Sequence, residues 1–392
     1  MIQMLRLKLF ILVALLLSLV LGGCWDRKEI NDLALVTGVA IDKKDDKLIE
    51  VSVQIFIPQG STQGTQGASE APGGTGTTFV QSAHGENIAD ALSQLQQKFS
   101  RKIFWGHAEV FIFGEAKVKQ GLKEDMDFLM RDSEPRERAF VFVSKGKAKK
   151  ILEHHSILER NTSEVLREMA NNKTSITSSM AHLSEMLEDD SKTALLPWVE
   201  LMSPPKKDDP ARSVGYITGT AILHNGKLVG VADNRVTRGI LWIMNEMDNA
   251  IITIQPEGAS GTISVQLLRN RSSMKPSYQD GKWTMTIHVS CKNQLLQNTS
   301  DINLTESSDS LKKIEGQLER NIEERISLAV AKAKKSYKAD IFNFAGAYHR
   351  SYPRLWKQNQ KDWDAIFPQI KVIVKAKAEI LRPGMFNTQE SK

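Results

Sequence analysis

Thiol and imidazole side chains are the groups in this chain best suited to bind metals or to act as nucleophiles and bases. The chain holds two cysteines, Cys24 and Cys291, too few for a zinc site built on cysteines alone. None of the eight histidines falls in an HExxH motif or a comparable metal spacing. These histidines are His84, His107, His154, His155, His182, His224, His288 and His349. We therefore expect no metal, no cofactor and no catalytic residue.

Other residues with reactive or binding side chains have simpler structural explanations. His107 precedes an apolar strand beside Glu109, and we expect it to make a local hydrogen bond rather than act as a base. The segment RDSEPRER, residues 131–138, is interpreted as a salt-bridged connection rather than a binding loop. Trp356 and Trp363 are seven residues apart, which places them on one face of a helix, in the core rather than on a ligand platform.

Two further patterns could suggest ligand binding. Asp42, Asp45 and Asp46 lack the glycine and the distal glutamate of a calcium loop, so we predict a charged hairpin tip. The glycine-rich segment 58–79 has no GK[ST] motif, and we predict a mobile loop between two strands. The chain also has no G-x-S-x-G elbow and no dinucleotide fingerprint after a strand.

The N-terminus has the three parts of a secretion signal. Arg6 and Lys8 are followed by an apolar run, residues 9–21, and then by Gly22-Gly23. A spanning helix needs about 20 apolar residues, and this run has 13. A cleaved signal therefore fits better than an uncleaved short anchor. The rest of the chain should be a water-soluble body beyond the membrane.

Cys24 could end a span, pair with Cys291, or be a processing site. Counting leaves a disulfide open, because exported proteins can form them. Leu21-Gly22-Gly23-Cys24, however, resembles the bacterial lipobox. This resemblance implies a diacylated Cys24 and cleavage between Gly23 and Cys24. Cys291 would then be a lone thiol packed in a strand.

The charge balance argues against nucleic acid as a partner. The formal net charge is +6, and removal of residues 1–23, with Arg6, Lys8 and no acid, leaves +4. Basic and acidic residues are interleaved along the sequence, with no basic aromatic stripe. We expect a solvated surface rather than a nucleic-acid interface.

Strand and helix patterns predict a mixed α+β (α/β) fold with several domains. Strands and helices alternate through residues 24–204, the N-terminal region, which we divide into two subdomains. Residues 205–213, rich in proline and charge, form the predicted linker. The C-terminal domain, residues 214–386, begins with a hairpin around Asn225-Gly226. It continues as an antiparallel-rich sheet with a long helix through 311–330, and residues 387–392 form a tail.

Four segments in the same order resemble the Ger(x)C lipoproteins, the C subunits of nutrient germinant receptors in spore-forming bacteria. They are CWDRKEINDLALVTGVAID, FWGHAEVFIFGEAKVKQGL with FLMRDSEPRER, YITGTAILHNGKLVG, and YKADIFNFAGAYHRSYPRLWKQNQKDWDAIFPQIKVIVKAKAEILRPG. The resemblance covers essentially the whole chain. The long Gly/Gln-rich insertion after Ile57 is a departure from it.

The resemblance implies three α/β domains and a lipid anchor at the outer face of the spore inner membrane. It implies two partners, the integral membrane A and B subunits, and the bilayer itself through diacylglyceryl-Cys24. No enzymatic activity is implied. Nutrient recognition is attributed mainly to the membrane subunits, and contact of this chain with a small nutrient stays open.

Two other functions remain to be separated from this one. A lipid-tethered solute-binding protein, presenting a nutrient to a permease, would have two doubly wound α/β lobes around a cleft. A cell-wall hydrolase would need two converging carboxylates in a cleft. The hairpin-rich C-terminal half argues against the first, and the lack of a catalytic pattern against the second.

Overall fold

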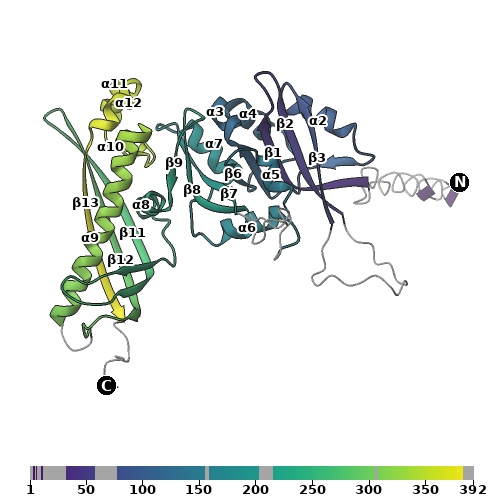
Figure 1. The fold of residues 1–392 in the computed structure, drawn as a ribbon. Helices are drawn as coiled ribbons and strands as arrows, with labels where there is room; N and C mark the ends of the chain where they lie inside the picture. The colour runs from purple at the N-terminus through teal and green to yellow at the C-terminus, as the bar shows by residue number, and fades with distance from the viewer. Residues whose placement is uncertain are drawn as a thin grey trace, which may run out of the picture.

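Two β-sheets and the helices packed on them form the part of the chain that the structure describes. The computed structural model describes residues 3–4, 6, 10–11, 32–57, 77–154, 159–202, 215–304 and 308–382. Figure 1 shows the larger sheet on the N-terminal side and the smaller, C-terminal one beyond α8. No helix among these residues is both long and apolar enough to cross a bilayer. The predicted mixed α+β fold is confirmed.

The larger sheet is parallel in its middle and antiparallel towards both ends. Its order is β3-β2-β1-β5-β6-β7-β8-β9, with β4 paired in parallel to β1. The parallel pairs along this order are β1 with β5, β5 with β6, and β6 with β7. The strands are β1 Leu33–Lys43, β2 Ile49–Ile57, β3 Thr77–Gly85, β4 Lys102–Phe104, β5 Val110–Gly114, β6 Phe140–Ser144, β7 Thr193–Leu201, β8 Gly215–His224 and β9 Lys227–Asp233.

Helices supply the crossovers that the parallel strands need, and they cover both faces of the sheet. They are α2 Ile88–Gln96, α3 Glu115–Gln120, α4 Lys123–Arg131, α5 Ala148–Leu152, α6 Thr162–Asn171 and α7 Met180–Glu188. One face packs on α2, α3, α4 and α7, and the other on α5 and α6. All five residues of β5 are buried, as expected for a central parallel strand. The predicted alternation of strands and helices is confirmed.

The larger sheet contains strands from both sides of the predicted linker. β7 and β8 pair antiparallel, beginning with Leu201 and Gly215. The predicted division at 205–213, which lies outside the described residues, is therefore not a division between sheets. β8 and β9 form the predicted hairpin, with Asn225 at φ 51° and Gly226 at φ 80°. Both residues take the left-handed conformation that a type I′ turn requires.

The glycine-rich segment ends earlier than predicted. Residues 77–79 belong to β3, where Phe79 pairs with Ile55 of β2. The mobile loop predicted over 58–79 is therefore wrong for its last three residues, because backbone pairing with β2 orders them. Residues 58–76 lie outside the described part of the chain.

The C-terminal sheet has the order β10-β11-β12-β13 and is covered on one face by helices. Its strands are β10 Ile251–Ile254, β11 Ile263–Gln279, β12 Lys282–Asn298 and β13 Lys371–Arg382. The first two pairs are antiparallel, as predicted, and β13 runs parallel to β12. The helices are α8 Asn234–Met244, α9 Ser308–Lys332, α10 Phe344–Ser351, α11 Pro353–Asn359 and α12 Trp363–Ile366.

The long helix α9 is the one predicted from the periodic apolar residues. Figure 1 shows it running along the strands of the C-terminal sheet. Ile314, Leu318, Ile322 and Ile326 are buried against that sheet and against α8. A π-helical turn, Ala333–Tyr337, and the left-handed Lys338 (φ 51°) end the helix.

Trp356 and Trp363 are core residues, as predicted, but they do not share one helix. Trp356 lies in α11 and Trp363 in α12, with a 3₁₀ turn, Gln360–Asp362, between them. Their ring centroids are 5.1 Å apart at an interplanar angle of 67°. Aromatic packing with Trp283 and Tyr348 sets the position of the two short helices, which the seven-residue spacing could not reveal.

Candidate functional site

Cys24, the predicted lipid-attachment residue, lies outside the described residues, so its acylation stays a prediction. Cys291 lies in β12 and is buried, as predicted. Burial raises the pKa of its thiol to about 11, which keeps it protonated at neutral pH and unreactive. Its Sγ accepts a hydrogen bond from Asn293 Nδ2 across 3.3 Å.

The three aspartates after β1 have separate structural roles and do not form a cation site. Asp45 accepts backbone N–H bonds within the turn, and Asp46 pairs with Lys43 at 2.6 Å, as a charged hairpin tip should. Asp42 does not belong to the tip, and this part of the prediction is wrong. In the described part of the chain, no group of three His, Cys, Asp or Glu side chains could hold a metal ion.

Asp42 caps a helix more than a hundred residues away. Its carboxylate accepts hydrogen bonds from the backbone N–H groups of Ala148, at 2.7 Å, and Lys149, at 2.9 Å, at the start of α5. Burial raises the pKa of Asp42, against the opposing effect of these bonds. A Cβ at Gly114 would lie 2.0 Å from Asp42 Oδ1, so only glycine fits beside the cap.

His107 and Glu109 lie along one groove, but each faces an arginine. His107 Nδ1 is 3.3 Å from Nη2 of Arg136, within the 131–138 connection. Arg167 Nη1 donates to both carboxylate oxygens of Glu109, at 2.6 and 2.7 Å. Arg167 also contacts Glu164. The groove, of about 310 Å³, therefore contains carboxylates that share the guanidinium of Arg167 rather than a free pair.

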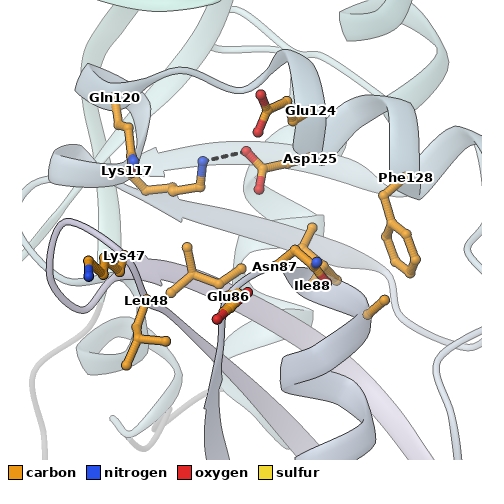
Figure 2. Close-up of a pocket in the computed structure, with 12 residues that line it drawn as sticks. Lys47, Leu48, Glu86, Asn87, Ile88, Lys117, Gln120, Glu124, Asp125 and Phe128 are labelled. Carbon is orange, nitrogen blue, oxygen red and sulfur yellow. Dashed lines mark ion pairs between the residues drawn. The ribbon is translucent and has the colours of Figure 1, made fainter.

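A second cleft lies between the β1–β2 turn, the start of α2, and α3 and α4. Figure 2 shows Lys117 of α3 and Asp125 of α4 pointing toward each other in the lining of this cleft, with Nζ and Oδ2 2.5 Å apart. Lys117 Nζ also donates to the carbonyl oxygen of Gly121 at 2.8 Å. Both side chains are buried, and burial raises the pKa of Asp125, although Lys117 opposes this. The ion pair fixes α3 against α4.

One of the polar side chains at the rim of this cleft already makes a hydrogen bond within the fold. Asn87 Oδ1 accepts the backbone N–H of Asp90 and caps α2. Glu86, Glu124 and Lys47 also line the cleft, whose volume is about 260 Å³. The Lys117–Asp125 pair is not predictable from the sequence, because two charges eight residues apart on different helices carry no periodic signal. The arrangement can hold a small polar molecule, but it offers no nucleophile with an adjacent base.

Two histidines join the larger sheet to the C-terminal helices. His349 Nδ1 in α10 is 2.7 Å from Asp190 Oδ2, just before β7. His224 Nε2, at the end of β8, is 3.2 Å from Asp364 Oδ2 in α12. These pairs link the larger sheet to α10 and α12. The histidines noted in the sequence thus include two that bridge separate parts of the fold.

Both halves of the chain match families of known proteins. Residues 26–201 match the family described as the spore germination protein N-terminal domain, and residues 218–384 match the family described as spore germination B3/GerAC like, C-terminal. YfkR of Bacillus subtilis (strain 168) is 30% identical over 362 residues, covering 92% of each chain. Spore germination protein KC of the same organism is 27% identical and covers 97% of each.

A solved structure shares the fold. The crystal structure of the GerBC protein superposes with a TM-score of 0.57 at 18% identity, covering 91% of this chain and all of that one. The family matches include strands of both sheets and most of each of the four sequence segments that suggested the resemblance. The chain therefore belongs to the Ger(x)C family of spore germination proteins.

Proposed function

We propose that this chain is the lipid-anchored C subunit of a spore nutrient germinant receptor. Cys24 would hold it at the outer face of the spore inner membrane, next to the integral membrane A and B subunits. The observation that carries this proposal is the family match over residues 26–201 and 218–384. The Leu21-Gly22-Gly23-Cys24 motif immediately before the matched region supports the anchor.

Within the receptor, the subunit acts by protein contact rather than by chemistry. Its buried charged residues are used to connect elements: Asp42 caps α5, and Lys117–Asp125 joins α3 to α4. Glu109 is bound by Arg167. Such contacts fix neighbouring elements against each other, which suits assembly and the transmission of a signal from the membrane subunits.

Isolation of the protein from spore membranes in mild detergent tests this function. The A and B subunits should be recovered with it, and deletion of the gene should abolish germination for the nutrients of one receptor. Recovery of this chain without either membrane subunit, together with normal germination on every nutrient, would contradict the proposal.

A tethered solute-binding protein is the second candidate, and the cleft of Figure 2 is the observation in its favour. Its Lys117 and Asp125 already neutralise each other, and the two sheets are too unlike to form paired lobes. Thermal unfolding with amino acids and sugars separates the candidates. A ligand at 100 times its Kd would stabilise the fold by about 2.7 kcal/mol.

A further inference from the structure

One face of the C-terminal sheet gathers basic side chains that are scattered in the sequence. Side chains in β11, β12 and β13 alternate between the two faces, and the register fixes which of them lie together. The inward face, with Met285, Ile287 and Val289, packs in the core with the helices. The outward face carries eight basic residues, which we call the basic face: Arg269, Arg271, Lys275, Lys282, Lys292, Lys371, Lys375 and Lys377.

The basic face is exposed and almost without counter-charge. All eight side chains are exposed, and His288 lies among them. The outward positions of the three paired strands include one acid, Glu379, whose Oε1 is 3.4 Å from Lys377 Nζ. Among the described residues, no ion pair involves the other seven. The face therefore holds an excess of seven positive charges, larger than the net charge of +6 of the whole chain.

The spacing of these charges produces one continuous positive surface. Arg269 is directly opposite Lys292, and His288 is directly opposite Lys375. Paired strands lie about 4.8 Å apart, which is less than the Debye length of about 8 Å at physiological ionic strength. Salt consequently screens neighbouring charges only in part, and their potentials add. A surface of this kind attracts an extended array of anions.

Three exposed leucines lie at one end of the same strands. Leu268, Leu296 and Leu381 are 45%, 52% and 51% exposed. Each is the extra residue at a register shift in β11, β12 or β13. Leu268 and Leu381 lie next to the row that contains Arg269 and Lys292, and Leu296 lies four residues beyond Lys292 along β12. A bulge releases one residue from the alternation, so a leucine can point to solvent. Leucines beside lysines and arginines are typical of surfaces that bind the headgroup region of a bilayer.

We propose that the basic face binds the anionic headgroups of a phospholipid bilayer, with the three leucines at the boundary of the acyl chains. This contact is distinct from the proposed lipid on Cys24 and lies on the C-terminal sheet. It rests on the proposed function only in requiring a membrane nearby. The exposed leucines favour a bilayer over an acidic protein, which would gain little from them.

Vesicle flotation of the chain from Cys24 onward, without acylation, tests the proposal. This chain contains every buried apolar residue of the described structure, the first being Ala34. It should bind vesicles of phosphatidylcholine with phosphatidylglycerol and not phosphatidylcholine alone. Each basic side chain near the surface contributes about fivefold in affinity. Replacement of Arg271, Lys275, Lys292 and Lys375 by glutamine should then weaken binding by more than about 100-fold.

A matched variant controls for net charge. Glutamine in place of Lys44, Lys123, Lys312 and Lys361, all exposed on other elements, removes the same four charges and should leave binding nearly unchanged. Raising the salt from about 0.1 M to about 1 M shortens the Debye length from about 10 Å to about 3 Å and should release the protein. Equal losses in both variants, or no preference for phosphatidylglycerol, would overturn the proposal. In the second case an acidic protein would become the better candidate for the partner of the basic face. Either outcome is independent of Cys24 acylation and of the A and B subunits.

Discussion

The indole of Trp363 donates a hydrogen bond from Nε1 to Oδ2 of Asp340 across 3.1 Å, inside the core of the C-terminal helices. The same carboxylate accepts the backbone N–H groups of Phe344, at 3.0 Å, and Ala345, at 2.7 Å, in the first turn of α10. Asp340 thereby caps α10 and ties it to α12. This link holds the segment around Trp363 beside Asp340, although α10, α11 and the 3₁₀ turn lie between the two residues in the sequence.

Replacement of Trp363 by phenylalanine should therefore cost more stability than the same replacement of Trp356. Both indoles are 3% exposed, but Trp356 Nε1 has no hydrogen-bond partner among the described residues. Loss of a hydrogen bond to a buried carboxylate should lower the free energy of unfolding by about 1.5–3 kcal/mol beyond the change in packing. Urea unfolding of the two variants measures the difference. Equal midpoints would show that the Trp363–Asp340 bond adds nothing.

The titration of Asp340 should make the fold less stable as the pH rises. Burial raises its pKa from 3.8 to about 6, while the N–H donors oppose this shift. Because the folded state holds the proton more tightly than the unfolded state, stability is lost between about pH 4 and about pH 6, by up to about 3 kcal/mol. Asp340→Asn has no such proton, so its stability relative to wild type should improve over this interval. Parallel stability curves for the two proteins would contradict the assignment.

Three glutamates of α9 bond to the free edge of β13. Glu315, Glu319 and Glu323 accept the backbone N–H groups of Ile380, Ala378 and Ala376, at 2.8, 3.1 and 2.9 Å. Four residues of helix rise about 6 Å, close to the roughly 6.6 Å of two strand residues, so the two repeats match. The side chains thus occupy an edge that could otherwise pair with another strand.

Glu319→Ala should expose the Ala378 amide, speed its hydrogen exchange, and lower the free energy of unfolding by about 1–2 kcal/mol. Glu319→Gln keeps a carbonyl acceptor and should have an intermediate effect. Glu324 lies exposed on the same helix, and its replacement by alanine provides the control. Exchange at Ala378 that is unaffected by the alanine at 319 would show that the edge is protected by other means.

Cys24→Ala should block both acylation and cleavage, because the thiol is the group that receives the lipid. The precursor would keep residues 1–23, and its mass on spore membranes would exceed that of the wild-type chain before the lipid is counted. Mass spectrometry of the N-terminal peptide checks this. A variant that is cut after Gly23 and still carries lipid would refute the assignment of Cys24.

Local elements were predictable from the sequence because their signals lie within a few neighbouring residues. The turn at Asn225-Gly226 needs only two residues that tolerate a positive φ. The helix α9 needs only an apolar residue every three or four positions, as at Ile314 and Leu318. The family resemblance rested on the same contiguous segments. The sequence alone thus determined most elements, the family and the proposed role of Cys24.

Partners distant in sequence were decided by the tertiary structure. In the sequence Asp42 resembles part of a charged turn, and the structure shows that its side chain caps the helix that begins at Ala148. Strand β8 belongs to the larger sheet, although a segment that resembles a linker precedes it. The basic face is the clearest case. Its lysines and arginines alternate with other residues along three strands, so they do not form a contiguous basic cluster in the sequence. Pairing in register places every second residue on one face, and the excess positive charge arises only there.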